Sequence, residues 1–242
     1  MASNSGFALW LTGMSGAGKS TLAEYIEARL RQVGRAVEVL DEREFEGVLW
    51  EAEAENKEQR VSHDRRLAVM ANLLARNQVA TLIASVSPYK SIREENRRLI
   101  GRYVEVYVDC PTEKLIARDS TGRYKKALAG EIPNFIGITE PYEPPTSAEV
   151  VIRSDTESVE EGGLRIFQAL LDLGYVSGED LKIITGRRLK ANPAVKKAHQ
   201  AKAAGKSSGK VSANASGTKA RPVQRAAKSS KPAPKTAAKR RK

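Results

Sequence analysis

The sequence has a single cysteine among its 242 residues and no long hydrophobic run. Because Cys110 has no second cysteine to pair with, no disulfide can form within the chain, as is typical of proteins in a reducing compartment. No apolar run approaches the ~20 residues of a membrane-spanning helix. The residues that follow Met1 lack the basic and apolar regions of a secretory signal. We therefore expect a cytoplasmic protein that makes no membrane contact, with Cys110 as a buried, unreactive thiol.

Acidic and aromatic residues are both absent from Gly186 to Lys242, a stretch that contains 18 lysines and arginines. Such a segment cannot bury enough apolar surface to offset its loss of conformational entropy. We therefore predict two parts: a folded domain over residues 1–185 and a disordered basic tail over residues 186–242. The tail has the charge to bind nucleic acid or an acidic partner, or it serves only as a tether.

The most informative segment is Gly13–Ser20, GMSGAGKS, which fits the phosphate-binding pattern G-x-x-x-x-G-K-[ST]. An apolar run at 7–12 precedes it, and a helical apolar pattern follows it, so the motif lies in the strand-loop-helix context that it requires. Glycines let successive backbone amides point at phosphate oxygens, and the helix dipole adds to that field. In this pattern the lysine, Lys19, reaches the outer phosphates, and the hydroxyl of Ser20 can bind Mg²⁺.

Strand and helix patterns alternate along the rest of the folded part. Further strands are expected at 36–41, 79–87, 103–109 and 150–152, and helices at 60–74, 92–100, 111–118 and from Ser158 onward. Such alternation predicts an α/β fold, a three-layer P-loop NTPase-type sandwich with a parallel sheet and helices on both faces. Asp41 ends the second strand, so we expect it to face the ligand crevice at the carboxyl ends of the strands. The basic, glycine-bounded segment 119–131 has the composition of a mobile lid over a polyphosphate.

Several further stretches accompany the phosphate loop: residues 118–132 around the lid, NFIGI at 134–138 and PYEPP at 141–145. Together they resemble the adenylylsulfate (APS) kinases, enzymes that phosphorylate the 3′-hydroxyl of adenylyl sulfate with ATP and Mg²⁺. The resemblance covers about residues 6–175, and the part from the lid to Pro145 is more diagnostic than the phosphate loop. It does not specify the oligomeric state, for which a homodimer is one alternative.

The resemblance implies roles for residues on the nucleotide side. ATP would be held by Arg118 and the phosphate loop, and the loop residues are Gly13, Met14, Ser15, Gly16, Ala17, Gly18, Lys19, Ser20 and Thr21. The lid lysines Lys125 and Lys126 would surround the phosphates and the substrate. Lys19 and Asp41 would be catalytic, with Asp41 orienting the acceptor hydroxyl.

It also implies roles for residues on the acceptor side. Phe135 would stack on the adenine of adenylyl sulfate. Arg60 would bind this substrate together with His63, which stands where the family has an asparagine. Ser87 matches a serine that is often described as a phosphoserine intermediate and is therefore a third catalytic candidate. Direct in-line transfer and a local hydrogen bond of the Ser87 hydroxyl are the alternatives that the chemistry favours.

The sequence departs from the family pattern after the second strand, where the family has Asp-Gly-Asp-Asn and, two residues later, Arg. Arg43 replaces the second aspartate, Glu46 replaces the arginine, and Glu55 replaces an aromatic residue before Arg60. Trp50 is a candidate for the missing ring. Asp41 and Glu44 are candidates for the missing carboxylate. Arg43 and the Arg65-Arg66 pair are candidates for the missing cation.

Three hypotheses follow. The first is transfer of the ATP γ-phosphate to the 3′-hydroxyl of adenylyl sulfate, which gives 3′-phosphoadenylyl sulfate in sulfate activation. The second is a related kinase with a different hydroxyl acceptor. The third is an ATP-binding regulatory or nucleic-acid-associated protein with a degenerate acceptor site.

Overall fold

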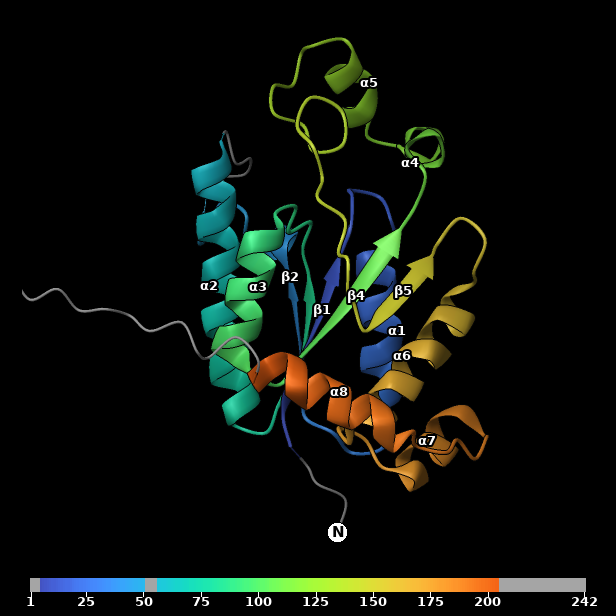
Figure 1. The fold of residues 1–242 in the computed structure, drawn as a ribbon. Helices are drawn as coiled ribbons and strands as arrows, with labels where there is room; N and C mark the ends of the chain where they lie inside the picture. Colours follow the sequence, from blue (N-terminus) through green and yellow to red (C-terminus); the bar gives the residue numbers. More distant parts are fainter. Residues whose placement is uncertain (1–4, 51–55, 205–242) are drawn as a thin grey trace, which may run out of the picture. The chain divides into compact units, whose positions relative to one another are not determined.

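A single parallel sheet forms the centre of the structure, a computed structural model that describes residues 5–50 and 56–204 (Figure 1). Its strand order is β2-β3-β1-β4-β5. The strands are β1 (Phe7–Thr12), β2 (Val37–Asp41), β3 (Ala80–Ala84), β4 (Tyr103–Asp109) and β5 (Val150–Arg153). Every pairing is parallel. The predicted α/β sandwich is therefore confirmed.

Helices cover both faces of the sheet, with α2 (Lys57–Arg76) and α3 (Lys90–Ile100) on one face and α1 (Lys19–Gln32) and α6 (Val159–Leu173) on the other (Figure 1). Two short helices, α4 (Thr112–Arg118) and α5 (Arg123–Leu128), follow β4. A 3₁₀ helix (Glu42–Phe45) follows β2, and α7 (Gly178–Thr185) and α8 (Pro193–Ala204) end the described chain. No helix in these described ranges is long and apolar enough to cross a membrane.

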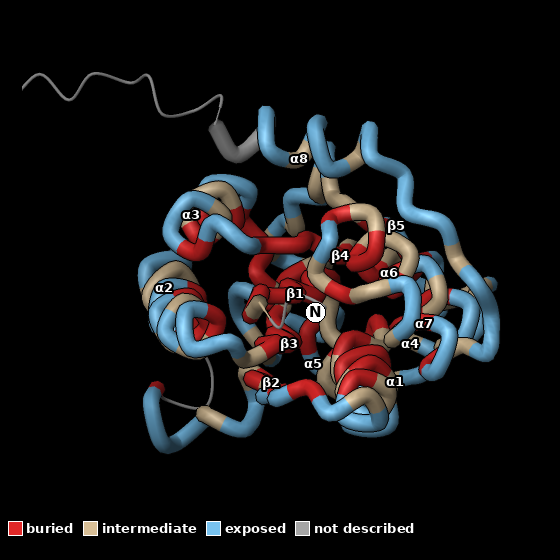
Figure 2. The backbone as a smooth tube through the Cα atoms, turned by 90° about the horizontal axis from the view of Figure 1, so that it is seen from below, coloured by how far each residue is buried: buried red, intermediate tan, exposed pale blue. Residues whose placement is uncertain are grey.

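The central strand β1 is buried along its whole length (Figure 2). Its side chains alternate between the two apolar clusters of the protein, as successive residues of a strand must. Phe7, Leu9 and Leu11 pack into the cluster that contains α1 and α6. Ala8 and Trp10 pack into the cluster that contains α2. A strand enclosed in this way fixes the start of the loop that follows it.

The third strand is shorter than predicted, because it ends at Ala84 and not at Ser87. Ser87 has a φ of 42°, a left-handed conformation that a strand cannot contain. The backbone leaves the sheet here and brings Ser85 and Ser87 toward α2. Cys110 is a buried free thiol, as predicted.

The end of the domain was placed too early by the sequence, because α8 is a helix within the tail that we expected to be disordered from Gly186. Pro193 suits the first turn of a helix, and Ala194 donates its backbone N–H to Asn192 Oδ1 at 3.1 Å. Leu189 and Val195 pack against the core cluster, and Gln168 donates to the backbone oxygen of Lys190 at 3.0 Å. Alanine and lysine are good helix formers, and these apolar and polar contacts dock the segment on the folded domain. The remainder of the predicted tail, from 205 on, lies outside the described residues.

Candidate functional site

The phosphate loop joins β1 to α1 at the carboxyl edge of the sheet. A Cβ on Gly13 would lie 2.3 Å from the backbone oxygen of Val108 on β4, so only glycine fits there. Gly18, just before α1, has a φ of 98°, which also favours glycine. The motif residues therefore form a tight turn before α1. The backbone N–H groups of the first turn of α1 can bind an anion there.

Lys19 lies folded over this loop. Its Nζ donates to the backbone oxygens of Gly13 at 2.9 Å and Met14 at 3.0 Å. Burial lowers the pKa of Lys19, while the carboxylates of Glu42 and Asp41 oppose that shift. The ammonium group is thus held inside the curve of the loop, where phosphate oxygens would replace the two carbonyls as its partners.

Asp41 ends β2 and reaches the first turn of α1. Ser20 donates its hydroxyl to Asp41 Oδ2, and Arg43 donates its backbone N–H to Oδ1 at 3.1 Å. The guanidinium of Arg43 adds an ion pair with Oδ2 at 2.8 Å. Although burial acts in the opposite direction, the hydrogen bonds from Arg43 and Ser20 keep the pKa of Asp41 below its usual value. Asp41 is therefore an ionised carboxylate next to the hydroxyl that the motif offers to a metal.

A pocket adjoins the loop at Ser15 and lies between α2 and the segment that follows α5. It combines arginine and carboxylate side chains with aromatic rings. Of the residues predicted to bind the substrate it contains Arg60, His63 and Phe135, whereas Lys125, Lys126 and the catalytic candidate Ser87 do not line it. The lining includes Glu42, Arg43, Glu46, Trp50, Arg60, His63, Asp64, Arg123, Phe135 and Ile136. Arg60 also donates to the backbone oxygen of Asn134 at 2.7 Å, which ties α2 to the opposite wall.

Two aromatic groups line this pocket, Phe135 and the stacked pair of Trp50 and His63. Phe135 is almost fully buried and packs edge-to-face on Tyr124, with ring centroids 4.9 Å apart. Trp50 stacks on His63 at 4.8 Å, so one face of the tryptophan already has a partner. Burial, together with the charges of Arg66 and Arg60, lowers the pKa of His63 and favours the neutral ring. The stacked pair lines the same pocket as Phe135.

Ser87 is buried, and its hydroxyl group has partners on both sides. Trp10 Nε1 donates to Ser87 Oγ at 2.8 Å, and Ser87 donates to Asp64 Oδ1 at 2.7 Å. The hydroxyl is therefore engaged in hydrogen bonds, but these two partners are distant in the sequence and are not local partners of the kind that the sequence interpretation expected. This geometry gives no access to a phosphate donor.

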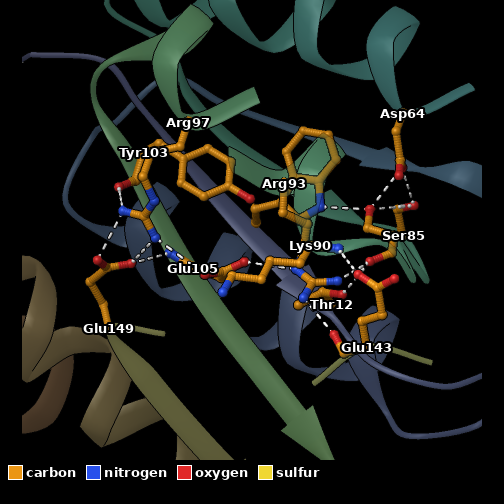
Figure 3. A network of polar contacts seen from close by, with 12 residues as sticks. Thr12, Asp64, Ser85, Lys90, Arg93, Arg97, Tyr103, Glu105, Glu143 and Glu149 are labelled. Carbon is orange, nitrogen blue, oxygen red and sulfur yellow. Dashed lines mark hydrogen bonds and ion pairs between the residues drawn. The ribbon is translucent and has the colours of Figure 1, made fainter. Parts of the chain in front are cut away.

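An ion network fixes the loop that carries Ser87 (Figure 3). Arg93 of α3 donates to the backbone oxygen of Ser87 at 2.6 Å and to Glu105 of β4 at 3.0 Å. Arg97, one turn later, pairs with Glu105 and with Glu149. These buried pairs join α3, β4 and the segment before β5, and they hold the loop whose residues Val86 and Pro88 line the pocket.

Asp64 is a pocket residue that the sequence interpretation missed. It is buried, and its Oδ2 has no hydrogen-bond partner among the described residues. Burial raises the pKa of Asp64 to about 7, against the effect of the hydrogen bonds from Ser87 and Ser85. The signal was present, because Asp64 shares the buried face of α2 with Leu67, Ala68 and Ala71. Aspartate is seldom fully buried, so a carboxylate on an apolar helix face indicates a functional or structural role.

Three predicted residues, Lys125, Lys126 and Arg118, do not line the pocket. Lys125 and Lys126 are exposed on α5. Arg118 donates to the backbone oxygen of Ser154 at 2.8 Å, beside β5. Arg123, which the sequence interpretation did not select, lines the pocket instead. Tyr124 donates its hydroxyl to the backbone oxygen of Ser15 at 2.8 Å and links the lid to the phosphate loop.

Comparison with known proteins gives one consistent result. The family model described as adenylylsulphate kinase matches residues 5–153. An adenylyl-sulfate kinase of Rippkaea orientalis is 46% identical over 172 residues, which are 71% of this chain and 95% of that protein. The corresponding enzyme of Myxococcus xanthus is 44% identical over 180 residues, which are 73% of this chain and 97% of that protein.

Solved structures agree with this result. The Mycobacterium tuberculosis APS kinase in complex with AMPPNP and APS is 31% identical, with a TM-score of 0.65 over 69% of this chain and 98% of that chain. A hexameric APS kinase from Thiobacillus denitrificans is 28% identical, with a TM-score of 0.55 over 72% of this chain and 30% of that chain.

Proposed function

This chain belongs to the adenylylsulphate kinase family, and we propose that it transfers the γ-phosphate of ATP to the 3′-hydroxyl of adenylyl sulfate. The products would be ADP and 3′-phosphoadenylyl sulfate, the activated form of sulfate. The observation that carries the proposal is the direct contact between two sites: Ser15 belongs to the phosphate loop and also lines the pocket with Arg60 and Phe135. A nucleotide on the loop and an acceptor in the pocket would therefore meet end to end.

Phosphoryl transfer depends mainly on positioning and on neutralising charge. The amides after Gly13 and the ammonium of Lys19 would bind the β- and γ-phosphates. Tyr124, which joins the lid to Ser15, would help to exclude water when the lid closes over the substrates. Asp41 contacts Ser20 of the phosphate loop and the pocket residue Arg43, and it would orient the acceptor hydroxyl.

Mg²⁺ is the metal that a phosphate loop of this kind uses, and the donor chemistry of the site fits it. The Ser20 hydroxyl and the Asp41 carboxylate are adjacent oxygen ligands of the type that Mg²⁺ prefers. When bound, the ion neutralises charge on the β- and γ-phosphates. Ser20 would hold it directly, with Asp41 beside it.

Acceptor recognition would use what the pocket contains. Phe135 would stack on the adenine, and the Trp50–His63 pair lines the same pocket. Arg60 and Arg123 are the cations available for the sulfate and phosphate of the substrate, because Glu46 replaces the family arginine. This replacement is the observation that favours the second candidate, a related kinase for another hydroxyl acceptor.

A transfer assay with ATP, Mg²⁺ and adenylyl sulfate tests the proposal, with Lys19→Ala as the inactive control. We expect 3′-phosphoadenylyl sulfate from the unchanged protein. The variant should lose about 10²–10³-fold in kcat, the usual effect of removing one group that stabilises charge in a transition state. A folded Lys19→Ala protein with full activity would refute the role of the lysine. If the unchanged protein bound ATP but formed no product, adenylyl sulfate would be the wrong acceptor.

A further inference from the structure

Arg43 lies across the two oxygens that the site offers to a divalent cation. Its Nη2 donates to Ser20 Oγ at 2.7 Å and to Asp41 Oδ2 at 2.8 Å. Its Nε donates to Asp41 Oδ1 at 3.0 Å. One guanidinium thus contacts both the hydroxyl of the phosphate loop and the carboxylate at the end of β2.

These contacts leave little capacity for a second cation. The single proton of Ser20 points to Asp41, and Arg43 occupies a lone pair of the same oxygen. Asp41 accepts from Ser20 and from both the backbone and the side chain of Arg43. A divalent ion bound to Ser20 would lie within a few ångströms of the guanidinium charge, so the two positive groups exclude each other.

Arg43 is nevertheless able to move. Its side chain is 65% exposed, whereas that of Asp41 is 7% exposed. The arginine starts from the short 3₁₀ helix after β2 and lines the pocket beside the loop. Guanidinium groups bind phosphate oxygens in a bidentate manner, so the same side chain can turn from Asp41 to a nucleotide phosphate.

We propose that Arg43 is a built-in cation of the phosphate loop, which competes with Mg²⁺ for Ser20 and Asp41 and supplies charge to the nucleotide phosphates when Mg²⁺ is absent. The inference rests on the proposed function only as far as ATP binding. Its consequence is that nucleotide affinity depends less on Mg²⁺ in this protein than in a variant without the arginine.

Calorimetry with the non-hydrolysable analogue AMPPNP tests this, with free Mg²⁺ either removed by a chelator or supplied in excess. The key variant is Arg43→Gln. Arg165→Gln is a matched control, because Arg165 is also half-exposed and pairs with a carboxylate, Glu157, at 2.8 Å. The quantity compared is the ratio of the dissociation constants without and with Mg²⁺.

We expect this ratio to rise by about tenfold in Arg43→Gln, the effect of one charge-assisted contact at a partly exposed site, and to stay unchanged in Arg165→Gln. The rise should combine weaker binding without Mg²⁺ and tighter binding with it. Equal ratios in all three proteins would overturn the inference while leaving the proposed function intact. Failure of all three to bind AMPPNP would overturn both.

Discussion

Phe135 lines the pocket from the segment after the lid, and its ring packs on Tyr124. Its proposed role is to stack on the adenine of the acceptor. Phe135→Leu keeps most of the buried volume but removes the flat ring, so the fold should survive. We expect the KM for adenylyl sulfate to rise by about tenfold or more, because stacking of a base on an aromatic ring contributes roughly 1–3 kcal/mol. The KM for ATP should change little.

Steady-state kinetics with each substrate varied in turn checks this prediction. A larger change in the KM for ATP than in that for the acceptor would place Phe135 at the nucleotide and reject the assignment.

Asp64 makes the stability of the protein depend on pH. Its pKa in the folded protein is about 7 because the carboxyl group is buried, whereas an unfolded chain has the ordinary value of ~3.9. Between these two values the folded state holds a proton that the unfolded state has lost. The free energy of unfolding should therefore fall as pH rises, by up to about 1.4 kcal/mol per pH unit, and level off above about pH 7.

Asp64→Asn removes this titration, so the variant should lose less stability than the unchanged protein between about pH 5 and about pH 8. Urea unfolding at both pH values measures it. Asp155→Asn, in the turn after β5, is the control. Parallel profiles for all three proteins would show that Asp64 is ionised in the folded state.

Individual residues differ in how far the sequence determines them. Lys19 and Ser20 could be predicted because the motif fixes the backbone, and the backbone fixes where these side chains begin. Arg43 could not, because its contacts with Ser20 and Asp41 depend on the path of a long side chain. The roles of Lys125 and Lys126 stay predictions, since they come from the family resemblance and both side chains are exposed on α5 in the structure.

Among the elements, α8 is the one that most changes the domain boundary. Val195 of α8 and Leu189 before it pack against the core, and Asn192, just before the helix, donates its backbone N–H to Asp172 of α6 at 2.7 Å. A chain that ends at Ala204 should be as stable as the full protein. A chain that ends at Gly186 should lose about 2 kcal/mol of unfolding free energy, the value of partly burying two aliphatic side chains.

Thermal and urea unfolding of the two truncated chains measures this difference. Equal stability of both would mean that α8 contributes nothing to the folded domain, contrary to its contacts with α6.

Periodicity predicted the long elements well because their burial follows a single rule. The strands at 7–12 and 103–109 were predicted with their observed bounds, and the capping residue Ser158 was identified before α6. Helix α7 and the whole of α8 were missed, because short helices with few apolar residues depend on docking to the rest of the fold. The end of β3 was misplaced for a similar reason, since the polar contacts of Ser87 with Trp10 and Asp64 draw the chain off the sheet.

At the scale of the molecule, alternating patterns predicted a parallel sheet, but not its order. The order β2-β3-β1-β4-β5 places β1 between β3 and β4, so the phosphate loop lies centrally at the carboxyl edge of the sheet. Ligand sites of open α/β sheets lie at such an edge. The pocket that contains Arg60 and Phe135 adjoins the loop there through Ser15.

The two parts of the sequence differ in the sign of their net charge. Residues 1–185 have a net charge of −6, and the basic residues of the tail account for the overall +12. Binding of the tail to nucleic acid or to an acidic partner stays a prediction, and so does the formation of a homodimer. The tail from 205 on lies outside the described residues.

The most direct test of the central claim is a competition between acceptors. The full chain would be incubated with γ-labelled ATP, Mg²⁺ and an equimolar mixture of adenylyl sulfate, AMP and a sugar acid, and the labelled products would be separated. We expect the label on the 3′-oxygen of adenylyl sulfate. Label on another acceptor, or only in inorganic phosphate, would contradict it.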